Sequence, residues 1–569
     1  MSKKTPRIFT PINSLKELYT HAGEHFGDKI AYRFYSKEGD IDTLTYRQFE
    51  HRVSRLAAGL DTLGLCGKRV AVIGEASPDW VATYIAVIST GGVIIPLDKE
   101  LLTGEIANFL NRSEADALVF SRSFNKKFDQ FSCGTATVSR FIAMDPDGYA
   151  FPESKTVLSL SEVIRDGQNK LCERGYSLPE NSDREKMSCM LFTSGTTGTS
   201  KCVMLSEKNL CSCINSCCAS VDFNPDDVVV SVLPLHHTYE LACTLAELNY
   251  GIEICVNDSL KKVVKNLAVF KPTALVLVPL FVSTIYKKIW DEAKKKGRAD
   301  ILRRGIAVAN TVKLFGLDIS RNMFKEVLDV FGGRLTKIVC GGAPMDPSMV
   351  KAFAAFGISI VEGYGITECS PLIAVTPYYR QKPGSVGPAV PCCTVSILDA
   401  SPDDKGHMVG EIVVKGDNVM LGYYKNEEAT REAFTEDGWY RTGDLGYMDS
   451  DGYIYITGRK KNVIVLNNGK NVFPEEIEEY LGKIDIISEC VVVGRTNKET
   501  GEVTLTAVVY PDFSQFENTD IEDIAAAVRE KVMEVNKKLP GFKQVRNVEI
   551  KKTEFEKTSS KKIKRYTVE

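Results

Sequence analysis

The sequence predicts an α/β protein: a large N-terminal domain with layered, mostly parallel sheets and flanking helices, followed by a small α+β domain. Three observations support this class. Apolar stripes at helical spacing alternate with short buried apolar runs through most of the 569 residues. Glycine-rich loops follow several of these runs, as they do at the carboxyl ends of parallel strands. Near the C-terminus the pattern changes to paired strands and one long amphipathic helix.

The alternation is clear near the amino terminus. Thr45 and Gln48 form a capping-box pattern that begins a helix. Residues 70–73 then read as a buried strand, 80–88 as a second helix and 93–95 as another strand. This order favours two parallel neighbours in one sheet. The apolar stripe of the first helix is Phe49, Val53, Leu56, Leu60 and Leu63.

A similar series occurs further along the chain. Residues 338–340 read as a strand, 341–344 as a Gly-Gly-Ala-Pro loop and 347–356 as a helix. Residues 358–361 form the next predicted strand, which leads into EGYGITE at 362–368. Ligands of α/β sheets bind at the carboxyl ends of such strands.

The domain boundary is predicted at residues 459/460, so that 1–459 form the large domain and 460–569 the small one. About 110 residues are enough for one folding unit. The elements expected in the small domain are a helix that begins at Pro474, strands 489–493 and 503–510, a helix over 521–539 and a strand over 548–550.

Composition narrows the partners and the compartment. The formal net charge of −3 gives no sign of the basic face that nucleic-acid binding usually needs, so we expect no nucleic acid. The 16 cysteines often lie in apolar runs, which favours reduced thiols in a cytoplasmic protein. The cluster Cys211, Cys213, Cys217 and Cys218 lacks a nearby His, which favours reduced thiols over a metal site.

Membrane contact is expected to be peripheral at most. The longest apolar run, 80–97, contains Gly91, Gly92 and Pro96, so it reads as helix, turn and strand rather than as a transmembrane segment. Contact at the inner face of a membrane stays open, as does the oligomeric state.

The chemistry is carried by short motifs in one order: TSGTTGTSK at 193–201, EGYGITE at 362–368, YRTGD at 440–444, GRKKN at 458–462 and TSSKKIKR at 558–565. In the first, glycines let backbone N–H groups approach phosphate oxygens, hydroxyls add hydrogen bonds and Lys201 adds charge. Because no Gly-Lys-Ser/Thr follows, this is not the phosphate loop of kinases and motor proteins. Alone it could equally be a flexible surface loop, but the ordered set favours phosphate binding.

Three acidic or aromatic positions fit a nucleotide. Glu368 is a candidate Mg²⁺ ligand, because this cation prefers oxygen, although a lone Glu is commonly a surface ion pair. Tyr364 offers a flat face to a purine. Asp444 can accept two ribose hydroxyls, and Arg459 can support the same sugar or the phosphate, although Thr-Gly-Asp is also good turn chemistry.

A histidine pair stands in PLHHTYE at 234–240, where His236 and His237 lie beside Glu240. A zinc site would need further ligands at a spacing that the sequence lacks. We therefore expect His237 to form a gate or wall of a substrate pocket.

Together these residues resemble the superfamily of acyl-CoA synthetases, peptide-synthetase adenylation domains and luciferases, from about Leu15 to Tyr566. Within it the chain looks most like bacterial long-chain fatty acid–CoA ligases. This likeness rests on PLHHTYE and on three segments: KPTALVLVPLFVSTIYKKIW at 271–290, RKKNVIVLNNGKNVFPEEIE at 459–478 and FEKTSSKKIKRY at 555–566. The Arg often found after Pro279 in these ligases is absent.

The resemblance implies ATP, Mg²⁺ and coenzyme A as ligands. Thr193 and Glu368 would hold Mg²⁺, Thr367 would touch the α-phosphate, and Asp444 and Arg459 would bind the ribose. The phosphates would be surrounded by Ser194, Gly195, Thr196, Thr197, Gly198 and Lys201. The adenine pocket would be formed by Gly342, Ala343, Glu362, Gly363, Tyr364 and Gly365.

The remaining implied roles lie in the small domain. Lys461 would be the hinge, Gly469 would pack against the coenzyme A arm, and Lys562 would be the catalytic lysine. Lys561 stands where relatives often have glycine, but counting back from Ile563 and Arg565 favours Lys562.

The implied activity is a long-chain fatty acid–CoA ligase reaction. A fatty acid would attack ATP to give an acyl-adenylate and pyrophosphate, and coenzyme A would then take the acyl group and release AMP. Two alternatives stay open: an adenylating enzyme for another acid or for a carrier-protein pantetheine, and a non-catalytic binding protein of the same fold.

Overall fold

The computed structural model describes residues 9–193, 200–315, 317–467, 470–496, 501–516, 519–557 and 563–568. The chain forms two compact units. The first contains Ser200–Val395, Val414–Tyr440 and the chain that precedes the 193–201 motif, and the second contains Ser396–Val413 and Arg441–Glu569. Residues 396–413 and 441–459, which the sequence assigned to the large domain, therefore belong to the same compact unit as the C-terminal part of the chain. The predicted domain boundary at residues 459/460 and the hinge near Lys461 describe a movement of the small domain, and both stay predictions.

The first sheet has eight strands in the order β15-β14-β13-β12-β10-β11-β1-β2. Its inner strands are parallel, and only β15 and β2 at the two edges run antiparallel to their neighbours. The inner strands are continuous apolar runs, as expected for a sheet covered on both faces. The strands are β1 (Ile30–Tyr35), β2 (Ile41–Thr45), β10 (Val228–Ser231), β11 (Glu253–Val256), β12 (Ala274–Leu277), β13 (Lys337–Gly341), β14 (Ser359–Gly365) and β15 (Leu372–Val375).

The second sheet also has eight strands, in the order β18-β9-β8-β4-β3-β5-β6-β7. It is parallel from β8 to β7, whereas β9 and β18 are antiparallel. The predicted pair of parallel strands near the amino terminus is confirmed as β3 and β4. The strands are β3 (Arg69–Ile73), β4 (Val93–Leu97), β5 (Ala117–Phe120), β6 (Arg140–Ala143), β7 (Val157–Ser159), β8 (Met187–Thr193), β9 (Lys201–Ser206) and β18 (Gly422–Tyr423).

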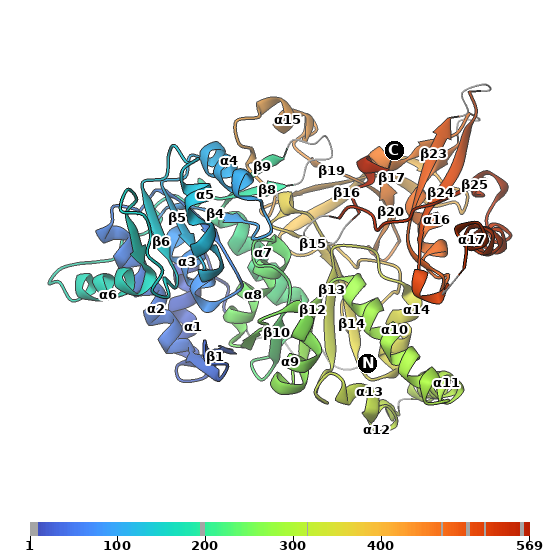
Figure 1. Cartoon of the computed structure of the whole chain (residues 1–569), viewed down its shortest axis with the longest axis horizontal. Coiled ribbons are helices and arrows are strands. Elements are labelled where there is room, and N and C mark those ends of the chain that lie inside the picture. Colours follow the sequence, from blue (N-terminus) through green and yellow to red (C-terminus); the bar gives the residue numbers. More distant parts are fainter. Residues whose placement is uncertain are drawn as a thin grey trace. The chain divides into compact units, whose positions relative to one another are not determined.

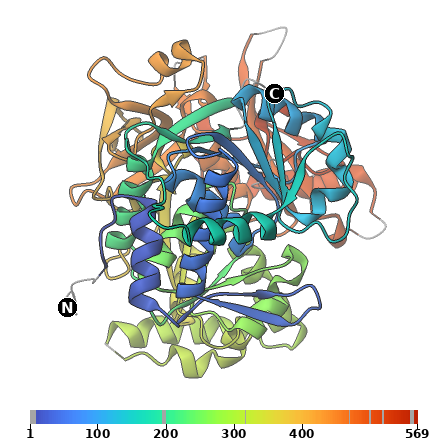
Figure 2. The same ribbon diagram turned by 90° about the vertical axis from the view of Figure 1, so that its left-hand side faces the viewer.

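Helices cover the sheets of this unit. Helix α7 contacts β8 and β9 of one sheet and β15 of the other, and α8 packs on α7, so the pair lies between the sheets (Figure 1). Figure 2 faces the side on which α2 and α6 pack together. The helices are α1 (Leu15–Phe26), α2 (Tyr46–Thr62), α3 (Pro78–Ser89), α4 (Thr103–Ser113), α5 (Phe128–Ser132), α6 (Leu160–Leu171), α7 (Glu207–Ser220), α8 (Thr238–Tyr250), α9 (Val263–Phe270), α10 (Pro279–Lys295), α11 (Ala299–Leu314), α12 (Ser320–Met323), α13 (Lys325–Asp329), α14 (Pro347–Ala355) and α15 (Glu427–Glu432).

Local sequence signals explain where these helices begin. The capping box of α2 is confirmed: the Gln48 N–H donates to the Thr45 hydroxyl over 3.2 Å, and the Thr45 N–H donates to the Gln48 side chain over 2.8 Å. Its predicted stripe is buried from Phe49 to Leu60.

Among the described residues, no helix is both long and apolar enough to cross a membrane.

The second unit is an α+β assembly with its own apolar core. The antiparallel pair β23–β24 is extended by the parallel strand β25. β23 is longer than the predicted 489–493, because its pairing with β24 continues at both ends. The elements are β16 (Cys393–Pro402), β17 (Met408–Gly416), β19 (Tyr440–Met448), β20 (Ile454–Arg459), β21 (Ile464–Val465), β22 (Asn471–Val472), β23 (Ile487–Thr496), β24 (Val503–Pro511), β25 (Asn547–Ile550), α16 (Pro474–Leu481) and α17 (Ile521–Asn536).

Candidate functional site

The predicted phosphate loop connects two neighbouring strands. Thr193 ends β8, Lys201 begins β9, and the two residues are cross-strand partners. The Thr193 hydroxyl lies 3.4 Å from the carbonyl oxygen of Lys201. The hairpin therefore holds both ends of the loop side by side. The loop residues Ser194, Gly195, Thr196, Thr197 and Gly198 lie outside the described part of the chain, and their role stays a prediction.

An arginine that the sequence did not single out holds the end of this loop. Arg112 donates to the Ser200 hydroxyl over 2.8 Å and to the Ser200 carbonyl oxygen over 2.7 Å. Its guanidinium lies over the rings of Phe109 and Phe192, which stack with centroids 4.2 Å apart. Two hydrogen bonds and two aromatic faces orient the guanidinium, so Arg112 restrains the point where the loop re-enters β9.

Glu368 reaches the same strand pair through a tyrosine. It lies in a short 3-10 helix, η3 (Thr367–Cys369), and its Oε1 accepts a 2.9 Å hydrogen bond from the Tyr423 hydroxyl. The ammonium of Lys201 lies 4.6 Å from the centroid of the Tyr423 ring. Burial and the Glu368 charge raise the pKa of Tyr423, so its hydroxyl stays a donor. Tyr423 therefore links the carboxylate of one motif to the lysine of another.

The donors at this place suit a magnesium ion that is shared with a polyphosphate. They are a half-buried carboxylate, Glu368, and the hydroxyl of Thr193. Among the described residues, no three His, Cys, Asp or Glu side chains could hold a metal ion together. Mg²⁺ usually takes one or two protein oxygens and completes its shell with phosphate oxygens and water, so this small donor set fits it.

The predicted adenine residues lie at the carboxyl ends of two adjacent parallel strands. Gly341 of β13 pairs with Gly363 of β14. Gly342 has a φ of 86°, a conformation that favours glycine, and Ala343 beside it is exposed. This edge is where parallel sheets place their ligand loops, as the sequence predicted.

The EGYG part of the next motif is strand rather than loop, which corrects the predicted strand end at residue 361. β14 continues to Gly365 because β15 pairs with it. A Cβ on Gly365 would lie 2.3 Å from the carbonyl oxygen of Pro371, so only glycine fits there. Glu362 is buried, and burial raises its pKa to about 7 although the Gly384 N–H lowers it. Tyr364 is buried beside it.

An apolar cavity lies directly beneath these residues. Its space, including the part that is open to solvent, is about 680 Å³, and none of its lining side chains carries a charge. One wall is a single face of α8 formed by Tyr239, Ala242, Cys243 and Ala246. The other lining residues are Cys217, Val221, Phe223, Val339, Gly341, Gly342, Gly363, Tyr364, Gly365, Pro371, Leu372 and Val375.

The cavity extends from the motif residues toward the opposite end of the sheet. Gly341 ends β13, whereas Lys337 begins it, and the Lys337 ammonium lies 5.3 Å from the ring centroid of Phe223. Gly341 and Phe223 both line the cavity, with Val339 between them along the strand. Four strand steps correspond to about 13 Å.

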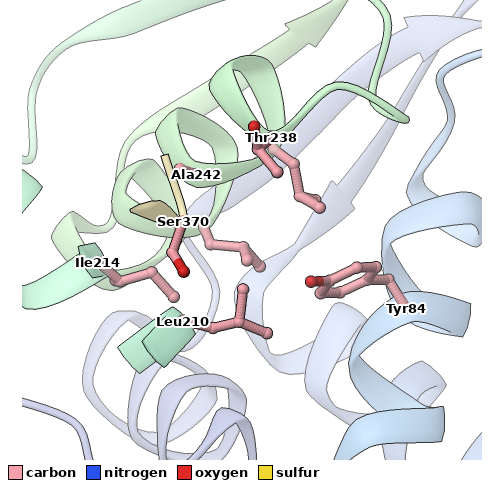
Figure 3. Close-up of a pocket in the computed structure, with 8 residues that line it drawn as sticks. Tyr84, Leu210, Ile214, Thr238, Ala242 and Ser370 are labelled. Atoms are coloured by element: carbon pink, nitrogen blue, oxygen red, sulfur yellow. The ribbon is translucent and has the colours of Figure 1, made fainter. Parts of the chain in front are cut away.

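A second cavity shares Ala242 with the first but is smaller, with about 250 Å³ of space. Figure 3 shows Tyr84 of α3 facing Leu210 and Ile214 of α7 and residues of α8 across it. None of the residues predicted for the site lines it, and its polar lining groups are the hydroxyls of Tyr84, Thr238 and Ser370. We therefore assign it no role in the site.

The histidine pair stands at the start of α8. His237 is the N-cap residue, and its ring centroid lies 4.2 Å from that of His236. The Nε2 of His236 lies 3.4 Å from a carboxylate oxygen of Asp98. His237 lines neither of the two cavities, so its role as a gate stays a prediction.

Glu240, close to these histidines in sequence, is a buried residue that stabilises the fold. It is buried, and one carboxylate oxygen accepts a hydrogen bond from the Ser231 hydroxyl at the end of β10. Burial raises its pKa to about 8, against the opposing effect of that hydroxyl and of the Val232 and Leu233 N–H groups. A buried carboxylate held in this way joins α8 to β10.

The predicted ribose residues lie together in the second unit. Asp444 of β19 and Arg459 of β20 are cross-strand partners, and the Arg459 Nε lies 2.9 Å from the Asp444 Oδ1. Asp444 is buried, and its N–H donates to the Thr442 hydroxyl over 3.0 Å. A carboxylate has about four acceptor positions, which suits the predicted contact of Asp444 with ribose hydroxyls.

The other predicted residues of this unit are only partly described. Lys461 is exposed in a 3-10 turn, η4 (Lys460–Asn462), directly after β20. Its neighbour Lys460 instead lies 2.8 Å from Glu411, which also binds Arg441. Gly469 and Lys562 lie outside the described residues, so their roles stay predictions.

Comparison with known proteins finds two family models that match the chain. The "AMP-binding enzyme" family matches residues 19–424, and the "AMP-binding enzyme C-terminal domain" matches residues 461–569. Long-chain-fatty-acid–CoA ligase FadD15 of Mycobacterium bovis is 29% identical over 502 residues, which cover 83% of this chain and 79% of the relative. The chloroplastic long-chain-fatty-acid–[acyl-carrier-protein] ligase AEE15 of Arabidopsis thaliana is 25% identical and covers 90% of this chain and 78% of its own.

Solved structures share the fold over nearly the full length. ATP-bound MatB from Rhodopseudomonas palustris is 25% identical, with a TM-score of 0.73 and coverage of 97% of this chain and 98% of its own. A Mycobacterium tuberculosis fatty acyl CoA synthetase has a TM-score of 0.65 at 22% identity, covering 98% of this chain and 97% of its own. Because the first family profile alone matches well over half of the residues, this chain belongs to the AMP-binding enzyme family.

Proposed function

We propose that this enzyme activates a fatty acid with ATP as an acyl-adenylate and transfers the acyl group to coenzyme A. The observation that carries the proposal is the uncharged cavity beneath Gly342 and Tyr364. An acid that enters it has one carboxylate at the motif end and an apolar remainder, because no lining side chain could pair with a second charge. The relatives named as long-chain fatty acid ligases support the same substrate class.

The dimensions of the cavity suit an alkyl chain. The α8 wall spans about 10 Å from Tyr239 to Ala246 at 1.5 Å per residue. An extended alkyl chain advances about 1.25 Å per carbon, because its bonds are about 1.5 Å long and meet at about 111°. This wall therefore accompanies about eight carbons, and the proposal of a long chain requires the tail to continue past it toward Phe223.

The residues of the site divide the work in the proposed reaction. Lys201 and the loop would hold the polyphosphate, and Tyr423 keeps the carboxylate of Glu368 oriented. Mg²⁺, when bound by Thr193 and Glu368, would neutralise charge on the departing pyrophosphate. Lys562 would lie between the acyl carboxylate and the α-phosphate and reduce their mutual repulsion.

The test is ATP-dependent formation of AMP and thioester across carboxylic acids of graded chain length, with coenzyme A or a pantetheinylated carrier protein as acceptor. Turnover that rises with chain length and requires coenzyme A supports the proposal. Turnover only with short, aromatic or amino acids contradicts the substrate, and thioester formation only on the carrier protein contradicts the acceptor. If no acid gives an adenylate, the proposal that the protein is an adenylate-forming enzyme is contradicted.

A further inference from the structure

One helix of the first unit has apolar residues on two faces. Leu302 and Ile306 of α11 pack against the core formed by β12, β13 and α14, and Ala309 is buried there. The opposite face carries Ile301 and Val308, which are 67% and 47% exposed. An amphipathic helix normally has polar residues on its solvent side, so this outer apolar face needs an explanation.

The outer face forms a continuous stripe. Ile301, Arg304, Val308, Thr311 and Phe315 recur at alternating spacings of three and four residues, which place them along one side of a helix. Each of the five is exposed or largely so, and Phe315 is 80% exposed. Single apolar residues scattered over a surface are common and need no explanation, but Ile301, Val308 and Phe315 are three large apolar side chains on one stripe.

Further exposed apolar residues lie in the same part of the chain. Leu317 is 64% exposed just beyond α11, and Met323 lies at the end of α12, where its sulfur approaches Gly305 of α11. Figure 1 shows α10, α11, α12 and α13 as neighbours in this unit. We call the surface formed by Ile301, Arg304, Val308, Phe315 and Leu317 the α11 surface.

Basic residues surround the α11 surface. Between residues 287 and 313 there are nine Lys or Arg and three Asp or Glu, although the whole chain has a net charge of −3. Lys294 and Lys295 end α10 and Lys296 is its C-cap residue, close in sequence to the start of α11, and all three are exposed. Their ion pairs with Glu292 and Glu326 are on the surface and contribute little.

We propose that the α11 surface docks on an anionic lipid bilayer. Apolar side chains with lysine and arginine beside them on one helical face suit the boundary between headgroups and acyl chains. The basic residues are attracted to the negative surface, and the long side chains allow their charges to stay at the headgroups.

Other partners fit the same surface less well. A second copy of the chain would bring identical positive patches together across a two-fold axis, where they repel. Nucleic acid would use the charges but not the exposed Ile301, Val308 and Phe315, because phosphate recognition is electrostatic. An anionic bilayer uses both kinds of side chain.

The experiment measures sedimentation of the purified full chain with phosphatidylcholine vesicles that contain or lack phosphatidylglycerol. The wild type should bind the anionic vesicles, and salt should weaken binding. Phe315→Ser with Leu317→Ser should reduce the affinity at least tenfold through lost apolar burial. Arg304→Glu should reduce it at least fivefold, because one basic residue near such a surface contributes about that factor.

Matched controls separate this surface from general effects. Leu102→Ser removes an equally exposed leucine, and Lys186→Glu makes the same charge change at an exposed lysine elsewhere in the unit. Both should bind like the wild type, and the thermal midpoints should show that all variants are folded. Binding of the wild type to neutral vesicles as strongly as to anionic ones would overturn the proposal, and so would an equal loss of binding in the control variants. A wild-type dimer that only the Phe315→Ser, Leu317→Ser variant fails to form would also overturn it.

Discussion

At the scale of single residues, Tyr423 is the least expected member of the site. Nothing in its local sequence marks it, because its importance comes from a 2.9 Å hydrogen bond to Glu368, 55 residues away. Its ring also receives the Lys201 ammonium. A side chain that contacts both the candidate metal ligand, Glu368, and the predicted phosphate-binding lysine, Lys201, should affect nucleotide use without contacting the acid.

We expect Tyr423→Phe to lower kcat/KM for ATP about tenfold and to raise the Mg²⁺ concentration needed for half-maximal rate. A hydrogen bond to a charged group contributes about 1.5 kcal/mol or more, which corresponds to about a tenfold change in rate. The measurement is initial rate against Mg²⁺ and ATP at saturating acid. Tyr424→Phe is the matched control, because the Tyr424 hydroxyl donates to Glu114 over the same 2.9 Å but outside the site. An equal loss in both variants would show a general structural effect.

The buried carboxylate of Glu240 leads to a prediction about stability. Its pKa is raised from 4.5 to about 8, so the folded state holds a proton that the unfolded state releases. Its contribution to stability is therefore complete below about pH 4.5 and is lost as the pH rises toward 8. Glu240→Gln, which never ionises, should gain stability relative to the wild type as the pH rises.

Thermal midpoints measured at about pH 5 and about pH 9 check this sign. The midpoint of Glu240→Gln minus that of the wild type should be more positive at the higher pH, by about 2 °C or more. Glu428→Gln, at an exposed position of α15, should show no such difference between the two conditions. A difference that falls with rising pH would contradict a neutral buried Glu240.

At the scale of elements, one face of α8 forms one wall of the proposed acyl cavity. Ala242 and Ala246 are both buried small residues on it, and they lie about 6 Å apart along the helix axis. Because the cavity runs from the motif residues toward Phe223, Ala242 lies nearer the reacting end than Ala246 does. A large side chain at position 242 or 246 should block the cavity at that depth and limit the length of the acyl chain.

We therefore expect Ala242→Phe and Ala246→Phe to shorten the preferred acid to different extents. The spacing corresponds to about five carbons, so the optimum of Ala242→Phe should be about five carbons shorter than that of Ala246→Phe. The measurement is kcat/KM across saturated acids of graded length. Retained turnover of short acids shows that the variants fold, and an unchanged optimum in both would exclude this cavity as the acyl site.

At the scale of the whole molecule, the candidate residues divide between two compact units. Strands β8 and β9, Glu368 and the cavity belong to the first unit, whereas Asp444 and Arg459 belong to the second. The proposed catalytic Lys562 and the predicted hinge at Lys461 fall within the sequence range of the second unit. The two proposed half-reactions, attack on the α-phosphate and then attack of the thiol on the acyl carbonyl, need different groups at one site, which is the reason to expect movement about Lys461.

We expect Lys562→Ala to abolish adenylate formation while leaving thioester formation from supplied acyl-AMP within about twofold of the wild type. The lysine would stabilise charge only as the carboxylate approaches the α-phosphate, so the second half-reaction does not need it. Pyrophosphate exchange measures the first half-reaction, and thioester formation from acyl-AMP measures the second. Lys561→Ala is the neighbouring control. Equal loss of both half-reactions in Lys562→Ala would contradict the role.

The sequence alone determined the family, the α/β class and the start of individual helices. These features depend on local chemistry: glycines and hydroxyls for phosphate, a capping box at Thr45, and apolar periodicity for buried strands. Even so, local chemistry misplaced the end of β14, because the pairing of β15 with Gly363 and Gly365 is not a local property.

Only the tertiary structure decided which distant side chains meet. It brought Tyr423 to Glu368, Arg112 to Ser200 and one face of α8 beneath Gly342, and it assigned Glu240 to the interior. It also exposed the outer stripe of α11, whose apolar residues would otherwise count as core. Periodicity shows that a helix has an apolar face, but packing in three dimensions decides whether that face meets protein, substrate or solvent.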